Sequence, residues 1–297
     1  MTGEPFIPEK ITVHLGAPDD RSAMNVTVNF VDYIKNVGSS ELYPTWPESA
    51  LRANLYAIIS FALNRIYTEW YPSRGYDFDI TNDTRYDQYY VHGRDIFQPI
   101  SDIVDEIFNN YIRRQGSVEP LFASYCDGVK TQCEGLKQWG TVDLAEQGYI
   151  PYRILTYYYG DNIDIVQNAP VAPNIPSYPG TPIQIGSAGD NVIRIQTQLN
   201  RIAGNYPAIP KIEPVTGYVD TNTADAVEAF QRIFNLPVTG VVDKATWYKI
   251  NFIFTSVTQL AELTSEGLTI SDLGLNLPKA LVMGDSGGNV RALQYLL

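Results

Sequence analysis

The chain has 297 residues, a formal net charge of -12, and 44% hydrophobic and 18% charged residues. Such an acidic chain repels a phosphate backbone, so no nucleic-acid partner is expected. No apolar run reaches the roughly 20 residues of a membrane span, and residues 1–10 lack the basic start of a secretory signal. Binding to an anionic polymer would need short-range contacts, for which the 21 tyrosines suit sugar faces.

Residues 1–165 mix predicted strands and helices without a regular βαβ order, which favours an α+β domain. Alternating side chains predict strands over 11–15 and 25–30. Two prolines followed by Glu48 predict a helix start, and the wide apolar face up to residue 63 indicates that this helix is buried. Further helices are expected over 96–111 and over 142–147, the latter ending at Gly148.

A proline-rich stretch, residues 166–184, predicts an extended linker. Beyond it the sequence repeats, because residues 185–199 align with residues 283–297 at matching glycines, an Asn-Val pair, a Gln and a Leu. The first copy, residues 185–253, is expected to form a small all-α three-helix bundle. A connector over 254–277 leads to a second copy, 278–297, which stops inside its first helix, so we expect a shortened repeat.

The two cysteines, Cys126 and Cys133, flank six residues that include an Asp-Gly turn. A disulfide and free thiols are equally open interpretations, and a disulfide would fit an oxidising location. A metal site ranks third, because His14 and His92 are the only histidines and nothing local completes a ligand set. The sequence therefore predicts neither a metal nor a cofactor.

The first repeat carries a specific set of residues. A glycine turn with Gly186 and Gly189 leads to Val192, and a later helix contains the run 229–231. Residues 236–247 then read LPVTGVVDKATW. This stretch places a capping Asp before a helix that contains Trp247. Over residues 185–250 this pattern resembles the peptidoglycan-binding domain 1 family. The resemblance implies that the chain binds peptidoglycan of the bacterial cell wall, with Trp247 equally open as a core or a contact residue.

Three stretches of the first domain carry a second resemblance. They are residues 39–54, SSELYPTWPESALRAN, residues 88–93, QYYVHG, and residues 135–160, which begin GLKQWG and end ILTYYYG. In this order they are similar to the stage II sporulation protein D and amidase-enhancer family. That family includes lytic transglycosylases, which cut glycan strands between N-acetylmuramic acid and N-acetylglucosamine, and members that stimulate a wall amidase.

The resemblance puts Glu41 at the catalytic position, as an acid that protonates the glycosidic oxygen and then as a base for the 6-hydroxyl of the sugar. This reaction needs no second carboxylate, unlike hydrolysis by a pair of acids. An aromatic and proline-rich setting would raise the pKa of Glu41 toward that of a working acid, whereas the plainer interpretation is an exposed loop glutamate. The expected substrate-binding residues are Ser40, Tyr43, Trp46, Gln88, Gln138 and Trp139.

This chain departs from the family where Glu134 and Lys137 replace a histidine-containing run and a serine, and residues 81–87 lack the zinc ligands of some members. The first alternative is therefore a non-catalytic wall protein, either a structural component of a spore or phage-tail-like particle or an amidase stimulator. A hydrolase that pairs Glu41 with Asp79 or Asp83 is a second alternative. The expected location is the cell wall, a spore or an extracellular particle. The protein is expected to reach it by a route other than general secretion, or with a leader peptide that is missing from this sequence. No oligomeric state is predicted.

Overall fold

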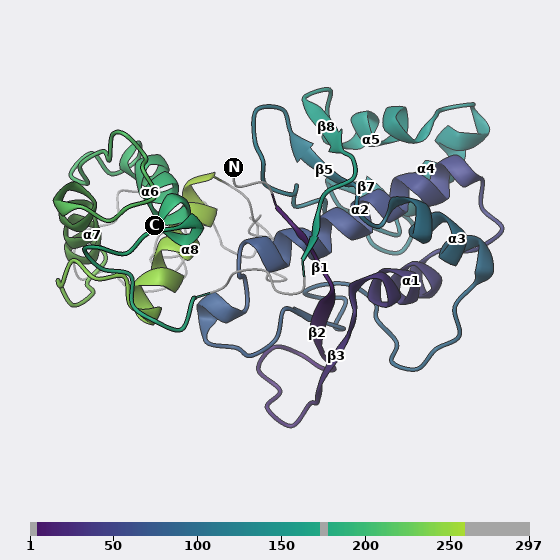
Figure 1. Ribbon diagram of the computed structural model, residues 1–297. Helices are drawn as coiled ribbons and strands as arrows, with labels where there is room; N and C mark the ends of the chain where they lie inside the picture. Colours follow the sequence, from purple (N-terminus) through teal and green to yellow (C-terminus); the bar gives the residue numbers. More distant parts are fainter. Residues whose placement is uncertain (1–4, 173–177, 259–297) are drawn as a thin grey trace, which may run out of the picture.

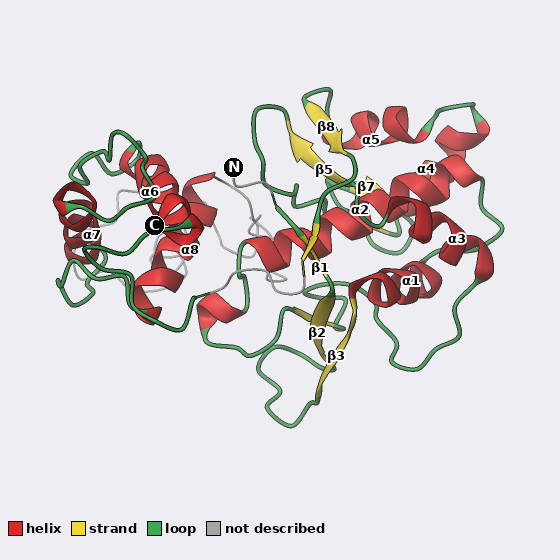
Figure 2. Cartoon of the chain, viewed as in Figure 1, coloured by secondary structure: helices red, strands yellow, loops and turns green. Residues whose placement is uncertain are grey.

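The computed structural model describes residues 5–172 and 178–258, which form two bodies of unequal size (Figure 1). The larger body mixes helices with small sheets, and the smaller body consists of three packed helices (Figure 2). The expected fold class, an α+β domain followed by an all-α three-helix bundle, is confirmed at this level. The helices of the larger body are α1 (Phe30–Glu41), α2 (Glu48–Tyr67), α3 (Gln98–Ile107), α4 (Gln138–Glu146), α5 (Pro151–Tyr159) and the short 3-10 turn η1 (Pro72–Arg74).

The strands of the larger body form four small sheets. A three-stranded sheet has β2 (Lys10–His14) at its centre, antiparallel to β3 (Asn25–Asn29) and parallel to β4 (Ile80–Thr81). The other sheets are strand pairs: β1 (Ile7–Pro8) with β9 (Val171–Ala172), β5 (Tyr111–Arg114) with β8 (Ile163–Val166), and β6 (Tyr125–Cys126) with β7 (Leu136–Lys137). The last pair is parallel and adjoins the candidate site.

Helix α2 is the central element of the larger body. Its apolar residues surround the helix axis, and it packs against α1, α3, α4, α5 and β5. A helix that is apolar on all sides must be buried, as the sequence predicted. At the crossing of α1, a side chain at Gly38 would meet Leu55 and Ile100 at less than 3 Å, so the glycine allows the helices to approach closely.

Two helices were missing from the sequence prediction, and a third begins earlier than expected. Helix α1 follows β3 directly, although Phe30 had been predicted to end a strand. Helix α5 begins at Pro151, a favourable first-turn residue, and α4 begins at Gln138, four residues before the predicted start at 142. Two of these differences matter most, because α1 ends at Glu41 and α4 begins at Gln138.

The smaller body contains α6 (Asp190–Ala203), α7 (Thr221–Ile233) and α8 (Lys244–Thr258). Two buried glutamines each hold the turn that precedes a following helix. Gln196 accepts the backbone N–H of Gly217, and Gln231 accepts that of Gly240. Both glycines adopt positive φ, of 71° and 68°, which disfavours other residues in these turns.

The predicted cap of the last helix is confirmed. Asp243 accepts the backbone N–H of Thr246 at 2.8 Å, as expected for a capping aspartate. The indole of Trp247, in the first turn of α8, is fully buried, which favours the core interpretation of this residue.

The bundle contacts the larger body through Glu69, the second residue after the end of α2. Its carboxylate Oε2 accepts the indole N–H of Trp247 at 3.0 Å and an amide N–H of Asn251, and Arg194 lies 3.8 Å from it. Glu69 has a φ of 49°, in the left-handed region that commonly terminates helices. The guanidinium of Arg74 lies 5.2 Å from the ring of Phe252, which extends the contact between η1 and α8.

The predicted domain boundaries differ in places from the ends of the observed helices and strands. Strands β8 and β9 reach into the stretch expected to be a linker, and α8 continues past residue 253 to Thr258. The remaining connector and the second repeat, 278–297, lie outside the described residues, so the boundaries stay predictions. Among the described residues, no helix combines the length and apolar character needed to cross a membrane.

Candidate active site

Glu41 is the last residue of α1, where its partly buried side chain faces the beginning of α4. Oε1 accepts the backbone N–H of Tyr89 at 2.8 Å, and Oε2 accepts the side-chain amide of Gln138 at 3.1 Å. Tyr125 acts on the same carboxyl group, whose pKa it lowers. The structure therefore contradicts the interpretation of Glu41 as an exposed loop residue, and it brings Glu41 and Gln138 together.

Burial raises the pKa of Glu41 to about 7, although the hydrogen bonds from Tyr89, Tyr125 and Gln138 act in the opposite direction. The position at the carboxyl end of a helix acts in the same direction as burial, because the helix dipole disfavours negative charge there. A carboxyl group with this pKa is partly protonated at neutral pH. It can therefore donate a proton, and its conjugate base can accept one.

Three aromatic side chains form a cluster beside this group, from residues just after α1 and at the start of α4. Trp46 and Trp139 meet edge to face with ring centroids 4.9 Å apart, and Tyr43 lies 5.6 Å from Trp46 and 5.5 Å from Trp139. Tyr43 is 57% exposed and Trp139 is 42% exposed, whereas Trp46 is buried beneath them. Trp139 is therefore a surface residue, and the two exposed rings provide faces on which a sugar can pack.

The two remaining predicted substrate-binding residues have internal partners. Gln88 is fully buried; its carbonyl oxygen accepts the hydroxyl of Tyr33 at 2.9 Å, and its amide donates to the carbonyl of Ile58 and the hydroxyl of Tyr125. Ser40 donates to the carbonyl of Asn36 at 2.8 Å, one turn earlier in α1. The side chain of Gln88 therefore lies in the protein interior next to the site, and the hydroxyl of Ser40 is engaged in a hydrogen bond within α1.

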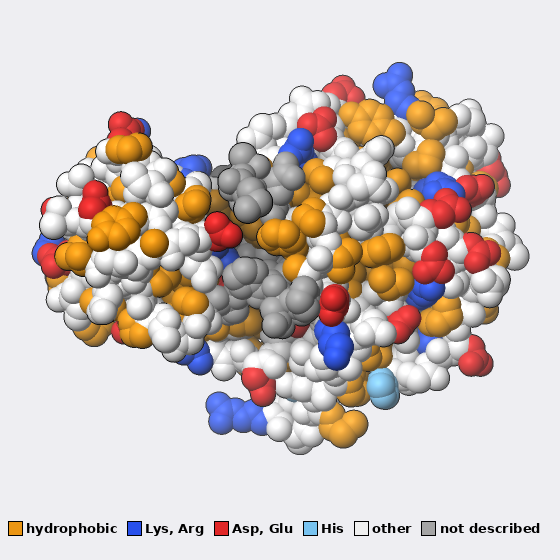
Figure 3. All heavy atoms as spheres, viewed as in Figure 1, with side chains coloured by type: hydrophobic (Ala, Val, Ile, Leu, Met, Phe, Trp, Pro, Cys, Tyr) orange, Lys and Arg blue, Asp and Glu red, His pale blue; other side chains and the backbone are white. Residues whose placement is uncertain are grey.

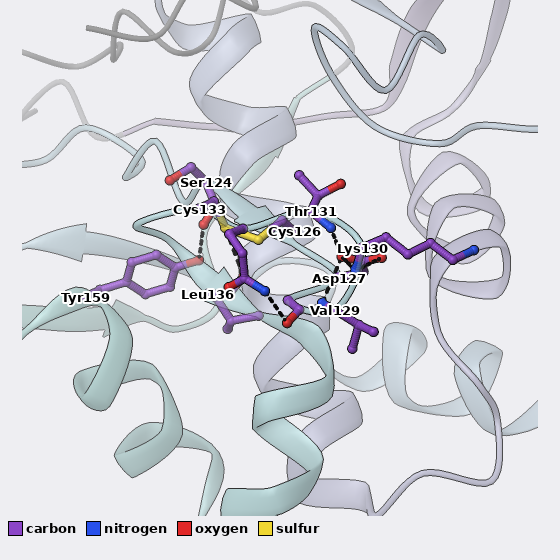
Figure 4. Close-up of a disulfide and its surroundings, with 11 residues drawn as sticks. Ser124, Cys126, Asp127, Val129, Lys130, Thr131, Cys133, Leu136 and Tyr159 are labelled. Carbon is purple, nitrogen blue, oxygen red and sulfur yellow. Dashed lines mark hydrogen bonds between the residues drawn. A yellow bond between two sulfur atoms is a disulfide. The ribbon is translucent and has the colours of Figure 1, made fainter. Parts of the chain in front are cut away.

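A disulfide joins Cys126 to Cys133 and closes the loop between β6 and β7 (Figure 4). Inside the loop, Asp127 accepts backbone N–H groups from residues 129–131. Gly135 has no room for a side chain, because a Cβ there would lie 2.1 Å from the carbonyl oxygen of Ser124. The loop thus connects Tyr125, which lowers the pKa of Glu41, at one end to Gln138, which donates to Glu41, shortly after the other.

The other carboxylates considered with Glu41 bind elsewhere. Asp79 accepts the backbone N–H of Thr12, and burial raises its pKa, while Asp83 is ion-paired with Arg85 in its own loop. Within residues 5–172 and 178–258 no three His, Cys, Asp or Glu side chains are arranged to hold a metal ion. A surface hollow of about 700 Å³ lies at the corner between α4 and α5, and another of about 430 Å³ lies beside β3. Neither hollow is lined by Glu41 or Gln138.

The face in Figure 3 shows acidic side chains scattered over both bodies, without one continuous patch. No broad charged surface on this face therefore marks a binding site. The aromatic rings and the carboxyl group of Glu41 remain the local features by which a neutral sugar could be recognised.

Comparison with known proteins identifies the smaller body. Residues 188–250, which contain all of α6 and α7 and the first half of α8, match the family described as "Putative peptidoglycan binding domain". A domain of this class binds the wall polymer, which suggests that the chain associates with the cell wall. No curated protein and no solved structure matches the chain. The resemblance of the first domain to the sporulation family remains a prediction.

Proposed function

We propose that the chain is a peptidoglycan-binding lytic transglycosylase, in which the bundle holds the wall and Glu41 cleaves the glycan. The contact between Glu41 and Gln138 supports this proposal most directly, because two residues 97 positions apart, both named from the resemblance, share a hydrogen bond. The exposed rings of Tyr43 and Trp139 beside them add a surface for the sugar. The N-terminal body is accordingly proposed to be related to the stage II sporulation protein D family.

In the proposed reaction the protonated carboxyl group of Glu41 donates its proton to the glycosidic oxygen as the bond from C1 of N-acetylmuramic acid breaks. The carboxylate then removes the proton of the 6-hydroxyl of the same sugar, whose oxygen bonds to C1 and closes a 1,6-anhydro ring. The proton balance returns Glu41 to its starting state, and no water is consumed. One carboxyl group is sufficient for both steps, which fits a site in which Asp79 and Asp83 are otherwise engaged.

The test is incubation of the purified protein with peptidoglycan, followed by mass spectrometry of the released fragments. Anhydro-muramic ends are expected from intact or peptide-stripped glycan. Reducing ends would indicate a hydrolase instead. Binding without any new ends, on both substrates, would overturn the proposal in favour of a non-catalytic wall protein or an amidase stimulator.

The proposed cleavage has a defined pH dependence. Since the pKa of Glu41 is raised to about 7, the reactive acid form is present below that pH and is lost above it. Cleavage should be constant from pH 5 to 6 and about tenfold lower at pH 8, since the protonated fraction falls in proportion. Initial rates of anhydro-end formation from pH 5 to 9 measure this. A decline that begins near pH 5 would show that the carboxyl group has an ordinary pKa.

Replacing the exposed ring at residue 139 should weaken substrate binding. In Trp139→Ala we expect KM to rise about threefold to tenfold with little change in kcat, because a stacked ring contributes about 0.5–1.5 kcal/mol beyond its buried area. Tyr157→Ala is the matched control, since Tyr157 is 64% exposed on α5. Equal effects of the two variants would remove the sugar-packing role of Trp139.

A further inference from the structure

The hollow beside β3 is lined by two cationic residues, Lys10 and Arg94. Among the described residues neither of them forms an ion pair. The side-chain Nε of Arg94 donates to the carbonyl of Asp95 at 3.0 Å, which leaves the two terminal nitrogens of the guanidinium for a ligand. Because the whole chain has a net charge of -12, two cations without a counterion in one hollow indicate that it suits an anionic group.

The same hollow also contains one carboxylate. Asp32, in the first turn of α1, lines it and accepts the side-chain amide of Asn29 at 3.1 Å. A ligand that carries only negative charge would be repelled by this group. The combination of Asp32 with Lys10 and Arg94 therefore complements a ligand that carries both carboxylates and an amino group.

The strand beside the hollow offers backbone groups as well. β3 is an edge strand of its sheet, next to β2 and α1 (Figure 1). Hydrogen-bonded and non-hydrogen-bonded pairs alternate along two antiparallel strands. The N–H of Phe30 donates to the carbonyl of Glu9, so in this register Thr27 belongs to a non-hydrogen-bonded pair. The backbone N–H and C=O of Thr27 thus point away from β2, where an extended peptide can pair with them.

One short segment connects the hollow to Glu41. Asn36, which lines the hollow, binds the backbone of Val91 through both side-chain atoms, at 2.8 and 2.9 Å. Two residues earlier, the N–H of Tyr89 donates to Glu41 at 2.8 Å, and Tyr90 between them lines the hollow. Asn36 and Glu41 are five residues apart in α1, which corresponds to about 7.5 Å along the helix axis.

We propose that the hollow beside β3 binds the stem peptide of peptidoglycan, with Arg94 and Lys10 on its carboxylates and Asp32 on its amino group. The inference rests on the proposed function, because it extends the substrate from the glycan to the peptide attached to it. The peptide branches from N-acetylmuramic acid, the sugar whose bond Glu41 is proposed to break. Three extended residues span about 10 Å, enough to reach from that sugar to the hollow.

The size of the hollow favours a peptide over the lactyl carboxylate that remains when the peptide is removed. Its volume of about 430 Å³ lies in the range of sites that bind whole small molecules, roughly 300–1,000 Å³. A lactyl group has only a few heavy atoms, carries no amino group for Asp32 and has no peptide backbone to pair with Thr27. Stem-peptide binding uses all three features of the hollow.

The test is isothermal titration calorimetry of the full chain with a disaccharide of N-acetylglucosamine and N-acetylmuramic acid, with and without its stem peptide. The peptide-bearing disaccharide should bind about tenfold more tightly, because charge-assisted hydrogen bonds are added. Acetylation of the peptide's amino group should weaken its binding about twofold to fivefold, since an exposed pairing with Asp32 is lost.

Variants separate the hollow from the bundle. In Arg94→Gln the Kd of the peptide-bearing disaccharide should rise about fivefold to tenfold, and in Lys10→Gln, at an exposed position, about twofold to fivefold. Lys130→Gln is the matched control, because it removes the same charge from an exposed residue that does not line the hollow. Thermal unfolding verifies that each variant is folded, and Lys10→Gln decides if Arg94→Gln is not.

Equal affinities for the two disaccharides, or equal affinities of the folded hollow variants and Lys130→Gln, would overturn the inference. If anhydro ends still form with one KM on intact and peptide-stripped glycan, the proposed function stands without the peptide site. Peptide-dependent binding that the hollow variants weaken, in a chain that releases no anhydro ends, would support the site and reject the cleavage. The two failures are therefore distinguishable.

Discussion

Glu41→Gln should abolish glycan cleavage while leaving wall binding intact. The amide has nearly the shape of the carboxyl group but cannot transfer a proton, so both proposed steps are lost. General acid–base catalysis typically contributes about 10²–10⁴-fold, and the rate of anhydro-end formation should fall by at least this factor. The measurement is mass spectrometry of released ends, with pelleting on insoluble peptidoglycan as the measure of binding.

A control for this variant lies close by in the sequence. Glu48→Gln changes an exposed residue in the first turn of α2, whose carboxylate pairs with Arg52, and should leave the rate unchanged. Persistence of cleavage in Glu41→Gln would eliminate the mechanism. Loss of wall binding in the same variant would mean that the larger body, and not only the bundle, holds the polymer.

Asp87→Asn should be among the most destabilising substitutions in the larger body. Asp87 and Arg65 form an ion pair with fully buried side chains, 2.7 Å apart, and Asp87 also accepts the backbone N–H and hydroxyl of Thr81. The guanidinium lies 4.6–5.9 Å from the rings of Phe61, Trp70, Tyr71 and Phe122. Without the carboxylate a buried cation loses its countercharge, at a cost of about 3–5 kcal/mol.

Thermal unfolding followed by circular dichroism measures this effect. The midpoint should fall by roughly 6–20 °C for a body of this size. Asp83→Asn is the matched control, because it removes the same kind of charge from an ion pair in which Arg85 is 70% exposed. Such pairs contribute only about 0–1 kcal/mol. Similar midpoints for the two variants would show that the buried pair adds little to stability.

The part of the fold that the sequence predicted well is the part with a clear local pattern. The apolar run from Ala50 to Leu63 predicted α2, and the repeat with its glycine turns predicted the bundle. Helix α1 was missed although Phe30, Tyr33, Ile34 and Val37 have helical spacing, because the alternating residues 25–29 before them favoured a continuing strand. The predicted helix over 142–147 was too short because the start at Gln138 has no side-chain cap.

The site was predictable only where a motif named its residues. Glu41 and Gln138 came from the resemblance, and their contact depends on tertiary packing of α1 against the segment that begins α4, which no local pattern encodes. Tyr125, which lowers the pKa of Glu41, lacked any signal, because a tyrosine beside Cys126 is one of 21 in the sequence. From the sequence, a disulfide and two free thiols are equally open for Cys126 and Cys133, because their spacing permits both states. Only the arrangement of β6 and β7 distinguishes the two possibilities.

The carboxylate of Glu69 also bears on how the wall would be cut. Two side chains of α8 donate hydrogen bonds to this carboxylate, so the peptidoglycan-binding bundle is held against the larger body. Under the proposed function this fixed contact sets the distance between the binding bundle and Glu41, so that glycan strands are cut at a constant spacing from the sugar that the bundle binds. A narrow distribution of fragment lengths would be its signature.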